Sequence, residues 1–265
     1  MSDFKARLAA LPPEKRKFLL EQLRKKREKA RREIPPQPRE GGDAFPLSFA
    51  QERMWFLHQL DPASAQYNVS VTMCFSGALD VERLKASIDL LTRRHEALRT
   101  TFRSLAGQPR QVIAEAGKPS LDIVDVRGAD DPDARFYELG EAALRSPFDL
   151  ENGPLTRWHL YRLAEDEARL LVVMHHIVSD GWSLGVLTRE LATVYRALAA
   201  GEAVHLPPLP VQCADFAVWQ RAWLQGKPLD RLLAYWEEQL VEAPQMLELP
   251  ADHPRPAERR GIGER

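Results

Sequence analysis

The sequence has few features of secreted or membrane proteins. Only two of its 265 residues are cysteines, Cys74 and Cys213, and they lie far apart. Two isolated thiols argue against a disulfide framework and are typical of core residues in a reducing compartment. No apolar run approaches the roughly 20 residues that a membrane-spanning helix needs, and the N-terminus has no apolar signal-peptide core. These absences predict a cytoplasmic protein without a membrane partner.

A strong net charge is missing too. The formal net charge is −1, which gives no overall attraction to nucleic acid or to an anionic membrane. The average hides an asymmetry, because residues 1–40 carry +7 and the remainder carries −8. The basic excess lies in a helix predicted from Pro12 to about Glu33, and a Pro-rich linker follows it at residues 34–38.

Three interpretations of this basic leader stay open: a solvated charged helix, a docking element for an upstream protein, and a nucleic-acid arm. Its charged stretch after Leu23 contains no aromatic residue, which argues against nucleic acid as a partner. We therefore divide the chain into a basic leader and linker (1–43), a folded lobe (44–243) and a Pro-rich, charged tail (244–265).

The folded lobe has the periodicities of an α/β protein. Alternating, β-branched residues predict a strand over Tyr67–Phe75. Spacings of three and four predict one helix after its cap Asp80, with an apolar face formed by Leu84, Ile88, Leu91, His95, Leu98 and Phe102. Further strands are predicted at 111–114, 121–126, 155–163 and 168–174, the last two paired, and helices at 132–145, 183–198 with Ser183 as cap, 211–225 and 229–242. Strands separated by amphipathic helices predict a mixed β-sheet with packed helices.

The pair His175-His176 is the strongest chemical signal. It directly follows the apolar run Leu170–Met174, which is typical of a buried strand. Asp180 and Gly181 come next, and Gly181 is expected to permit a sharp turn. Imidazole is the side chain best suited to accepting a proton near neutral pH.

This pattern, H-H-x-x-x-D-G, resembles the signature of the condensation-domain superfamily. Three further segments resemble other motifs of that family, in the family's order: Ser48–Leu57, Arg94–Phe102 and Asp215–Arg221. The chain is therefore similar to the N-terminal lobe of a nonribosomal peptide synthetase condensation domain, over about Pro46 to its end. The segment from Gln59 through Asn68 resembles the subtype that joins an L-configured donor to an L-configured acceptor.

The resemblance implies a chloramphenicol-acetyltransferase-like fold, in which two similar lobes form a V around the active-site tunnel. Motifs of the second lobe have no counterpart in this sequence, so we expect that lobe to be absent and activity of the first lobe alone to be open to question. The implied reaction transfers an acyl or peptidyl group between upstream and downstream peptidyl carrier proteins, next to other synthetase domains. The substrates are thioesters on phosphopantetheine arms, and no cofactor is bound by the domain itself.

The resemblance also implies roles for single residues. His176 is the catalytic position, either as a general base or as a group that orients the amine. His175 should face away from it and be structural. Asp180 is expected to pair with Arg99, although a triad in which it orients His176 stays open. Gly181 is a candidate to approach the thioester through its N–H.

Ser48 either lines the tunnel or caps a helix. A metal site is not expected, because neighbouring histidines on a strand diverge and no metal-ligand spacing is present. Other functions stay open: a related acyltransferase that uses a free amine or alcohol, an epimerising relative, or a non-catalytic module that docks carrier proteins.

Overall fold

The computed structural model describes residues 15, 33–39, 44–117, 119–244 and 250. The basic leader and the C-terminal tail expected from the sequence lie almost wholly outside these residues. The strands are β1 (Ala44–Pro46), β2 (Asn68–Ser76), β3 (Thr100–Leu105), β4 (Gln108–Ile113), β5 (Leu121–Asp125), β6 (Thr156–Arg162) and β7 (Glu167–His175). The helices are α3 (Phe49–Leu60), α4 (Val81–Arg94), the 3-10 helix η1 (Glu96–Arg99), α5 (Pro132–Arg145), α6 (Gly181–Ala200), α7 (Cys213–Trp223) and α8 (Lys227–Leu240).

The larger sheet has the strand order β2-β7-β6-β5. β7 runs antiparallel to both of its neighbours, whereas β5 is parallel to β6. The predicted hairpin of β6 and β7 is confirmed, with Arg162 opposite Ala168 beside the turn. The sheet is therefore mixed, as the sequence predicts.

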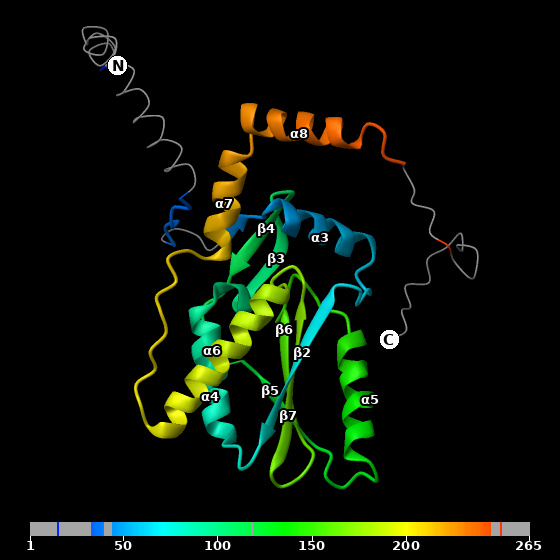
Figure 1. Cartoon of the computed structure of the whole chain (residues 1–265), viewed down its shortest axis with the longest axis vertical. Coiled ribbons are helices and arrows are strands. Elements are labelled where there is room, and N and C mark those ends of the chain that lie inside the picture. Colours follow the sequence, from blue (N-terminus) through cyan, green and yellow to red (C-terminus); the bar gives the residue numbers. More distant parts are fainter. Residues whose placement is uncertain (1–14, 16–32, 40–43, 118, 245–249, 251–265) are drawn as a thin grey trace.

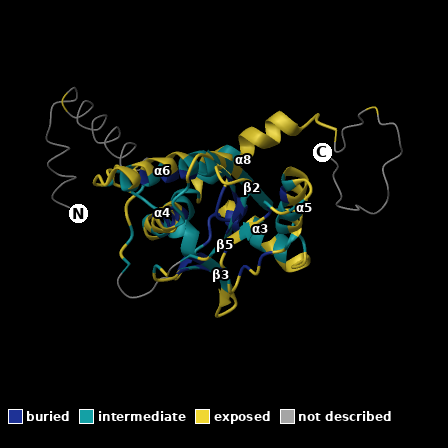
Figure 2. Ribbon diagram, turned by 90° about the horizontal axis from the view of Figure 1, so that it is seen from below, coloured by how far each residue is buried: buried dark blue, intermediate teal, exposed yellow. Residues whose placement is uncertain are grey.

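Helices cover both faces of this sheet (Figures 1 and 2). α4 and α6 pack together on one face, where the ring of Tyr195 on α6 lies 6.2 Å from that of Phe75 on β2. α5 lies on the other face, where Phe136 meets Tyr161 of β6 at 5.1 Å. The central strand β7 is thus shielded on both sides, which explains why Leu170–Met174 is an unbroken apolar run.

The helix predicted to extend through Phe102 is shorter in the structure, so that prediction is wrong at its C-terminal end. α4 ends at Arg94, and His95 adopts an extended backbone. After η1 the chain enters β3, which places Phe102 in the core from a strand. The spacing misleads because Leu98 and Phe102 contact the same core cluster as the α4 residues, although they belong to different elements.

A second, smaller sheet has the order β1-β4-β3. Of its strands, the sequence indicates only the end of β4. Phe45 on β1 and Ile113 on β4 form a separate small core with Ala214 of α7, and Val218 packs against it. This cluster fastens α7 to the small sheet.

Both cysteines are free and exposed, so their assignment as core thiols is wrong. Cys74 lies on β2, whose side chains alternate between exposed and half-buried positions at this end of the strand. β2 is an edge strand, so the sheet covers it along one side only. Cys213 is the first residue of α7.

Helix α8 buries none of its residues and is exposed along its length (Figure 2). Its exposed large apolar side chains are Leu233, Tyr235, Trp236 and Leu240. Within the described part of the chain, we find no helix with the length and apolar character needed to cross a membrane.

Neighbouring leucines on α4 give a stability test of this packing. Leu91 is fully buried in the main core, whereas Leu90 is 40% exposed. We expect Leu91→Ala to lower the free energy of unfolding by about 2–5 kcal/mol, and Leu90→Ala by about 0.5 kcal/mol or less. Urea titrations of both variants measure the difference. Equal losses would contradict the placement of α4.

Candidate functional site

The two histidines lie where the central strand ends. His175 is the last residue of β7 and pairs with Asn68 of β2. The next backbone N–H, that of His176, donates to the carbonyl of Tyr67 at 2.8 Å. The backbone pairing of the sheet therefore fixes the position of both histidines independently of their side-chain contacts.

His175 is buried, at 3% exposure, within the core below the turn. Its Nδ1 accepts a hydrogen bond from the backbone N–H of Ile177 at 3.0 Å. Its ring packs against those of His58 and Phe148, with centroid distances of 6.3 and 6.2 Å. Burial lowers its pKa to about 4, and the neighbouring histidines His58 and His176 act in the same direction. This neutral, packed ring fits the structural role expected for His175.

His176 is half-buried, and its Nδ1 is hydrogen-bonded to the backbone carbonyl of Ser179. A carbonyl oxygen can only accept, so Nδ1 must carry the proton. In the neutral ring this leaves a lone pair on Nε2. The geometry thus selects the tautomer that could accept a proton at Nε2.

The turn that holds His176 is itself rigid. The N–H of Val178 donates to the carbonyl of His175 at 3.1 Å, and the hydroxyl of Ser179 donates to the same oxygen at 3.2 Å. Ile177, Val178 and Ser179 are all buried. The Ser179 carbonyl therefore stays in place as the partner of the imidazole.

Asp180 serves as the N-cap of α6, so the prediction of Ser183 as the cap is wrong. The carboxylate of Asp180 accepts from the backbone N–H of Ser183 at 2.7 Å and from its hydroxyl at 2.6 Å. These hydrogen bonds lower the pKa of Asp180. A capping carboxylate also interacts favourably with the helix dipole.

Two other expectations for Asp180 are contradicted as well. It does not orient His176, because the Nδ1 of that ring is taken by Ser179. It does not pair with Arg99 either: no ion pair between them occurs among the described residues. Arg99 instead donates to the carbonyl of Ala114, whose N–H donates back to the Arg99 carbonyl at 3.0 Å. Arg99 therefore joins η1 to the end of β4.

Gly181 is the first residue of α6, and its φ lies outside the left-handed region. A Cβ added there would meet no atom within 4 Å. The turn therefore does not require glycine, contrary to the expectation from the sequence. The open space over its backbone leaves Gly181 accessible to an approaching group.

Ser48 caps α3, as one of the two interpretations predicts. Its hydroxyl accepts from the N–H of Gln51 at 3.2 Å, and the Gln51 side chain accepts from the N–H of Ser48 at 2.8 Å. Ser48 is buried. Its contribution to a tunnel wall stays a prediction.

An opening beside the histidine turn, which we call the apolar cavity, has a volume of about 540 Å³. Its walls come from the turn, from η1, from the first two turns of α6 and from α7; they include Leu98, Val178, Trp182, Val186, Cys213 and Phe216. Trp182 is 81% exposed at this cavity. Sequence reasoning missed these wall residues, although a tryptophan directly after the H-H-x-x-x-D-G pattern is a signal that could have been used.

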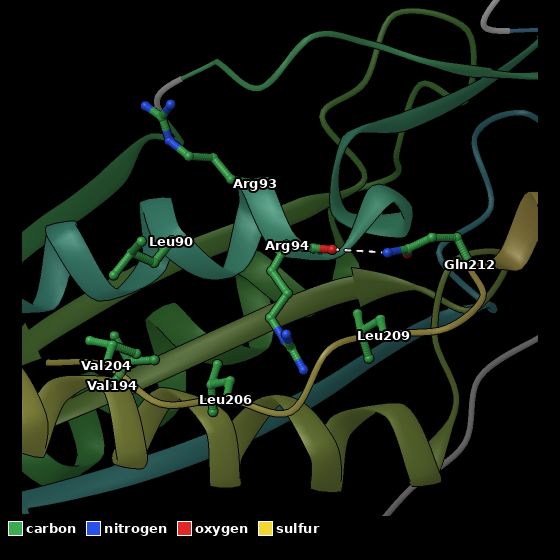
Figure 3. A pocket seen from close by; sticks show the side chains of 8 residues that line it. All are labelled: Leu90, Arg93, Arg94, Val194, Val204, Leu206, Leu209 and Gln212. Atoms are coloured by element: carbon green, nitrogen blue, oxygen red, sulfur yellow. Dashed lines mark hydrogen bonds between the residues drawn. The ribbon is translucent and has the colours of Figure 1, made fainter. Parts of the chain in front are cut away.

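A second opening, of about 470 Å³, lies between α4 and α6 (Figure 3). Arg94 at its wall forms an ion pair with Glu190, and His95 contacts the same carboxylate at 2.7 Å. Its lining does not include His176. Within the described residues, no three histidine, cysteine or acidic side chains are grouped closely enough to hold a metal.

Comparison with known proteins agrees with this geometry. The condensation-domain profile matches residues 42–265. Phosphinothricin tripeptide synthetase PhsC of Streptomyces viridochromogenes is 43% identical over 259 residues, which is 97% of this chain and 24% of that protein. Malpinin synthetase of Mortierella alpina is 43% identical over 221 residues, 83% of this chain and 3% of that protein.

Solved structures show the same fold. The starter condensation domain of rhizomide synthetase RzmA superposes with a TM-score of 0.70 at 23% identity, over 76% of this chain and 49% of that one. The first condensation domain of the CDA synthetase gives a TM-score of 0.69 at 25% identity, over 76% of this chain and 51% of that one. The chain thus spans about half the length of these solved domains and a quarter or less of the two curated relatives.

The cap made by Asp180 leads to a stability prediction. We expect Asp180→Ala to lower the free energy of unfolding by about 1 kcal/mol, whereas Asp180→Asn, which keeps an accepting oxygen, stays close to the parent. Urea unfolding at neutral pH measures both. An alanine variant as stable as the parent would rule out the capping role.

His175 leads to a pH prediction. Its folded pKa of about 4 lies below the ordinary value of 6.5, so the unfolded chain binds the proton more readily. Stability should therefore be complete above pH 6.5 and fall by about 3 kcal/mol as the pH decreases towards 4. Urea titrations across this range measure the slope. His175→Gln should remove this contribution to the pH dependence of stability, whereas His205→Gln, at an exposed position, should leave it unchanged.

Proposed function

The chain belongs to the condensation-domain family, and on that premise we propose that it takes part in amide-bond formation during nonribosomal peptide synthesis. The donor is an acyl or peptidyl thioester, and the acceptor is an aminoacyl thioester. Both are carried on phosphopantetheine arms of carrier proteins, which are substrates and not resident cofactors. We expect the partners to be the upstream and downstream carrier proteins and the reaction to occur in the cytoplasm.

The orientation of His176 is the observation that carries this proposal. Its Nδ1–H is held by the Ser179 carbonyl, so Nε2 offers a lone pair at the end of a rigid strand. The apolar cavity opens beside the same turn and is lined by Val178. His176 is not among the residues that line this cavity, so the proposal rests on the lone pair at Nε2, which suits a reaction in which an amine loses a proton.

In the proposed reaction the acceptor amine attacks the donor thioester carbonyl. A C–N bond forms and the C–S bond breaks, so the amine loses a proton and the departing sulfur gains one. His176 Nε2 accepts the proton and returns it to the thiolate, a form of help that typically contributes about 10²–10⁴-fold. Alternatively, Nε2 orients the amine by a hydrogen bond, and proximity provides most of the acceleration.

Gly181 and Trp182 complete the proposed site. Gly181 leaves open space over its backbone at the N-terminus of α6, so its own N–H is accessible to an approaching thioester. Trp182 at the apolar cavity offers an aromatic surface to the acyl chain. Arg99 supports the site only indirectly, through the joint between η1 and β4.

A second candidate function is carrier docking without catalysis. The exposed apolar side chains of α8, such as Leu233 and Trp236, favour this alternative, because contiguous apolar surface is typical of interaction sites. A free-amine acyltransferase and an epimerising relative are two further alternatives within the same superfamily.

Mass spectrometry of the acceptor carrier protein, after incubation with loaded donor carrier, tests the catalytic proposal. We expect the parent chain to transfer the acyl group and His176→Ala to reduce the rate by about 10²-fold or more if His176 is a general base. His205→Ala, an exposed histidine outside the site, should match the parent and serves as the control.

Other outcomes separate the alternatives. A loss of about tenfold or less in His176→Ala would favour orientation of the amine over proton transfer. Equal turnover with a free amine would indicate a different acyltransferase, and loss of deuterium from the α-carbon would indicate epimerisation. No product from the parent, together with carrier binding that His176→Ala does not change, would reject catalysis by this chain and support docking.

A further inference from the structure

We propose that Arg39, which precedes the lobe, is a positioning residue that holds two walls of the apolar cavity together. Arg39 lies before the range matched by the family profile, which begins at residue 42. The link from Arg39 to catalysis rests on the proposed function. The link from Arg39 to the cavity walls rests on contacts alone.

The segment of residues 33–39 is fastened to the lobe. The backbone N–H of Gln37 donates to the Asp215 carboxylate of α7 at 2.8 Å, and the Gln37 side chain donates to the carbonyl of Pro35 at 3.0 Å. Ile34 and Pro36 line an opening together with Trp223 of α7. The segment therefore follows α7 as part of the folded structure.

The Arg39 guanidinium joins two acidic residues that are far apart in the sequence. Its Nε and Nη2 donate to both oxygens of Glu96, at 2.9 and 2.8 Å, and its Nη1 donates to Asp215 at 2.8 Å. Arginine suits this position because its planar fork can make a two-point contact and still reach a second acceptor. A lysine ammonium cannot reproduce that geometry.

The charge balance depends on the same contact. Asp215 is only 2% exposed. Burial alone would raise the pKa of Asp215, but hydrogen bonds from Arg39 and from the backbone N–H groups of Gln37 and Gln212 outweigh it and lower this pKa. Among the described residues, Arg39 is the cation paired with this carboxylate. Without Arg39, a buried charge would lose its partner.

Both acidic residues are next in the sequence to residues that line the apolar cavity. Ala97 and Leu98, which follow Glu96, line the cavity from η1, and Cys213 and Phe216, on either side of Asp215, line it from α7. The bridge made by Arg39 therefore joins η1 to the first turn of α7. Movement of one wall relative to the other would have to break it.

Gln212 makes a second, weaker tie between the same elements. Its side chain donates to the Arg94 carbonyl at 3.0 Å (Figure 3) and accepts from the N–H of Glu96 at 3.3 Å. These are neutral hydrogen bonds, which are weaker than charge-assisted ones. Arg39 is therefore the stronger of the two ties, and it comes from outside the family-matched range.

Amide hydrogen exchange on the full chain tests the proposal without carriers or turnover. The reporters are the N–H of Leu98, bonded to the His95 carbonyl, and the N–H of Phe216, bonded to the Gln212 carbonyl. In Arg39→Ala both should exchange about 10- to 100-fold faster, the factor expected for lost charge-assisted hydrogen bonds. Arg39→Lys should give a smaller increase.

The matched control is Arg93→Ala. Arg93 has a side chain that is 53% exposed and makes one ion pair with Asp89 on the same helix, so its loss should leave both reporter amides unchanged. Amides of β7 should also keep their exchange rates in every variant. A uniform increase that includes β7 would mean global destabilisation and would overturn the proposal, as would unchanged exchange at Leu98 and Phe216.

A spectroscopic signature complements the exchange data. In protein labelled with 5-fluorotryptophan, the ¹⁹F signal of Trp182, assigned with Trp182→Phe, should shift or broaden in Arg39→Ala and not in Arg93→Ala. If Arg39→Ala does not fold, hydrogen exchange in Arg39→Lys and Glu96→Gln tests the bridge instead. Glu96→Gln should speed exchange mainly at Leu98, because Arg39 still holds Asp215 near Phe216; an unchanged rate at Leu98 in both variants rejects the bridge.

Discussion

Burial of β7 on both faces is the constraint on which the rest of the structure depends. β7 pairs with β2 and β6 in the middle of the sheet, so its length and register are fixed along both edges. Its two faces require two layers of helices, with α4 and α6 on one side and α5 on the other. A strand paired on both sides cannot shift its register, so its last residue, His175, has a fixed position. The backbone position of His176 is thus set by the packing of the core and does not depend on contacts of its side chain.

The partner of His176 decides what the imidazole can do. A carboxylate in that place would stabilise the imidazolium, as in a hydrolase triad. A backbone carbonyl fixes the tautomer but adds no negative charge. The hydrogen bond to Ser179 therefore leaves Nε2 as the ring nitrogen that carries the lone pair. Both roles proposed for His176 in thioester aminolysis, accepting the proton or orienting the amine, use a lone pair at this nitrogen.

Helices and strands were predicted best from the sequence where a run of regularly spaced apolar residues lies within a single element. α5 has the predicted bounds, and the hairpin of β6 and β7 is correct to within about two residues. Prediction failed where neighbouring elements share a core, as when Phe102 of β3 continues the spacing of α4. At the site, the motif indicated His176 as a candidate, which stays a prediction. The partner of Asp180 could not be predicted, because it depends on how the turn is folded. The apolar cavity was missed for the same reason, since its walls come from four separate segments.

The position of Arg39 changes how the boundary of the lobe is understood. A boundary drawn from the family match would treat residues 33–39 as a linker, yet the Arg39 guanidinium is shared by η1 and α7, two of the elements that line the apolar cavity. Charge-assisted hydrogen bonds to a buried carboxylate are directional, so they fix the position of one segment relative to another more closely than apolar contacts do. Because the segment ahead of the lobe is bound to those walls, its path along α7 and the shape of the cavity are coupled. A force that displaces the segment would act on the cavity walls through the Arg39 guanidinium and through the backbone N–H of Gln37, which also donates to Asp215.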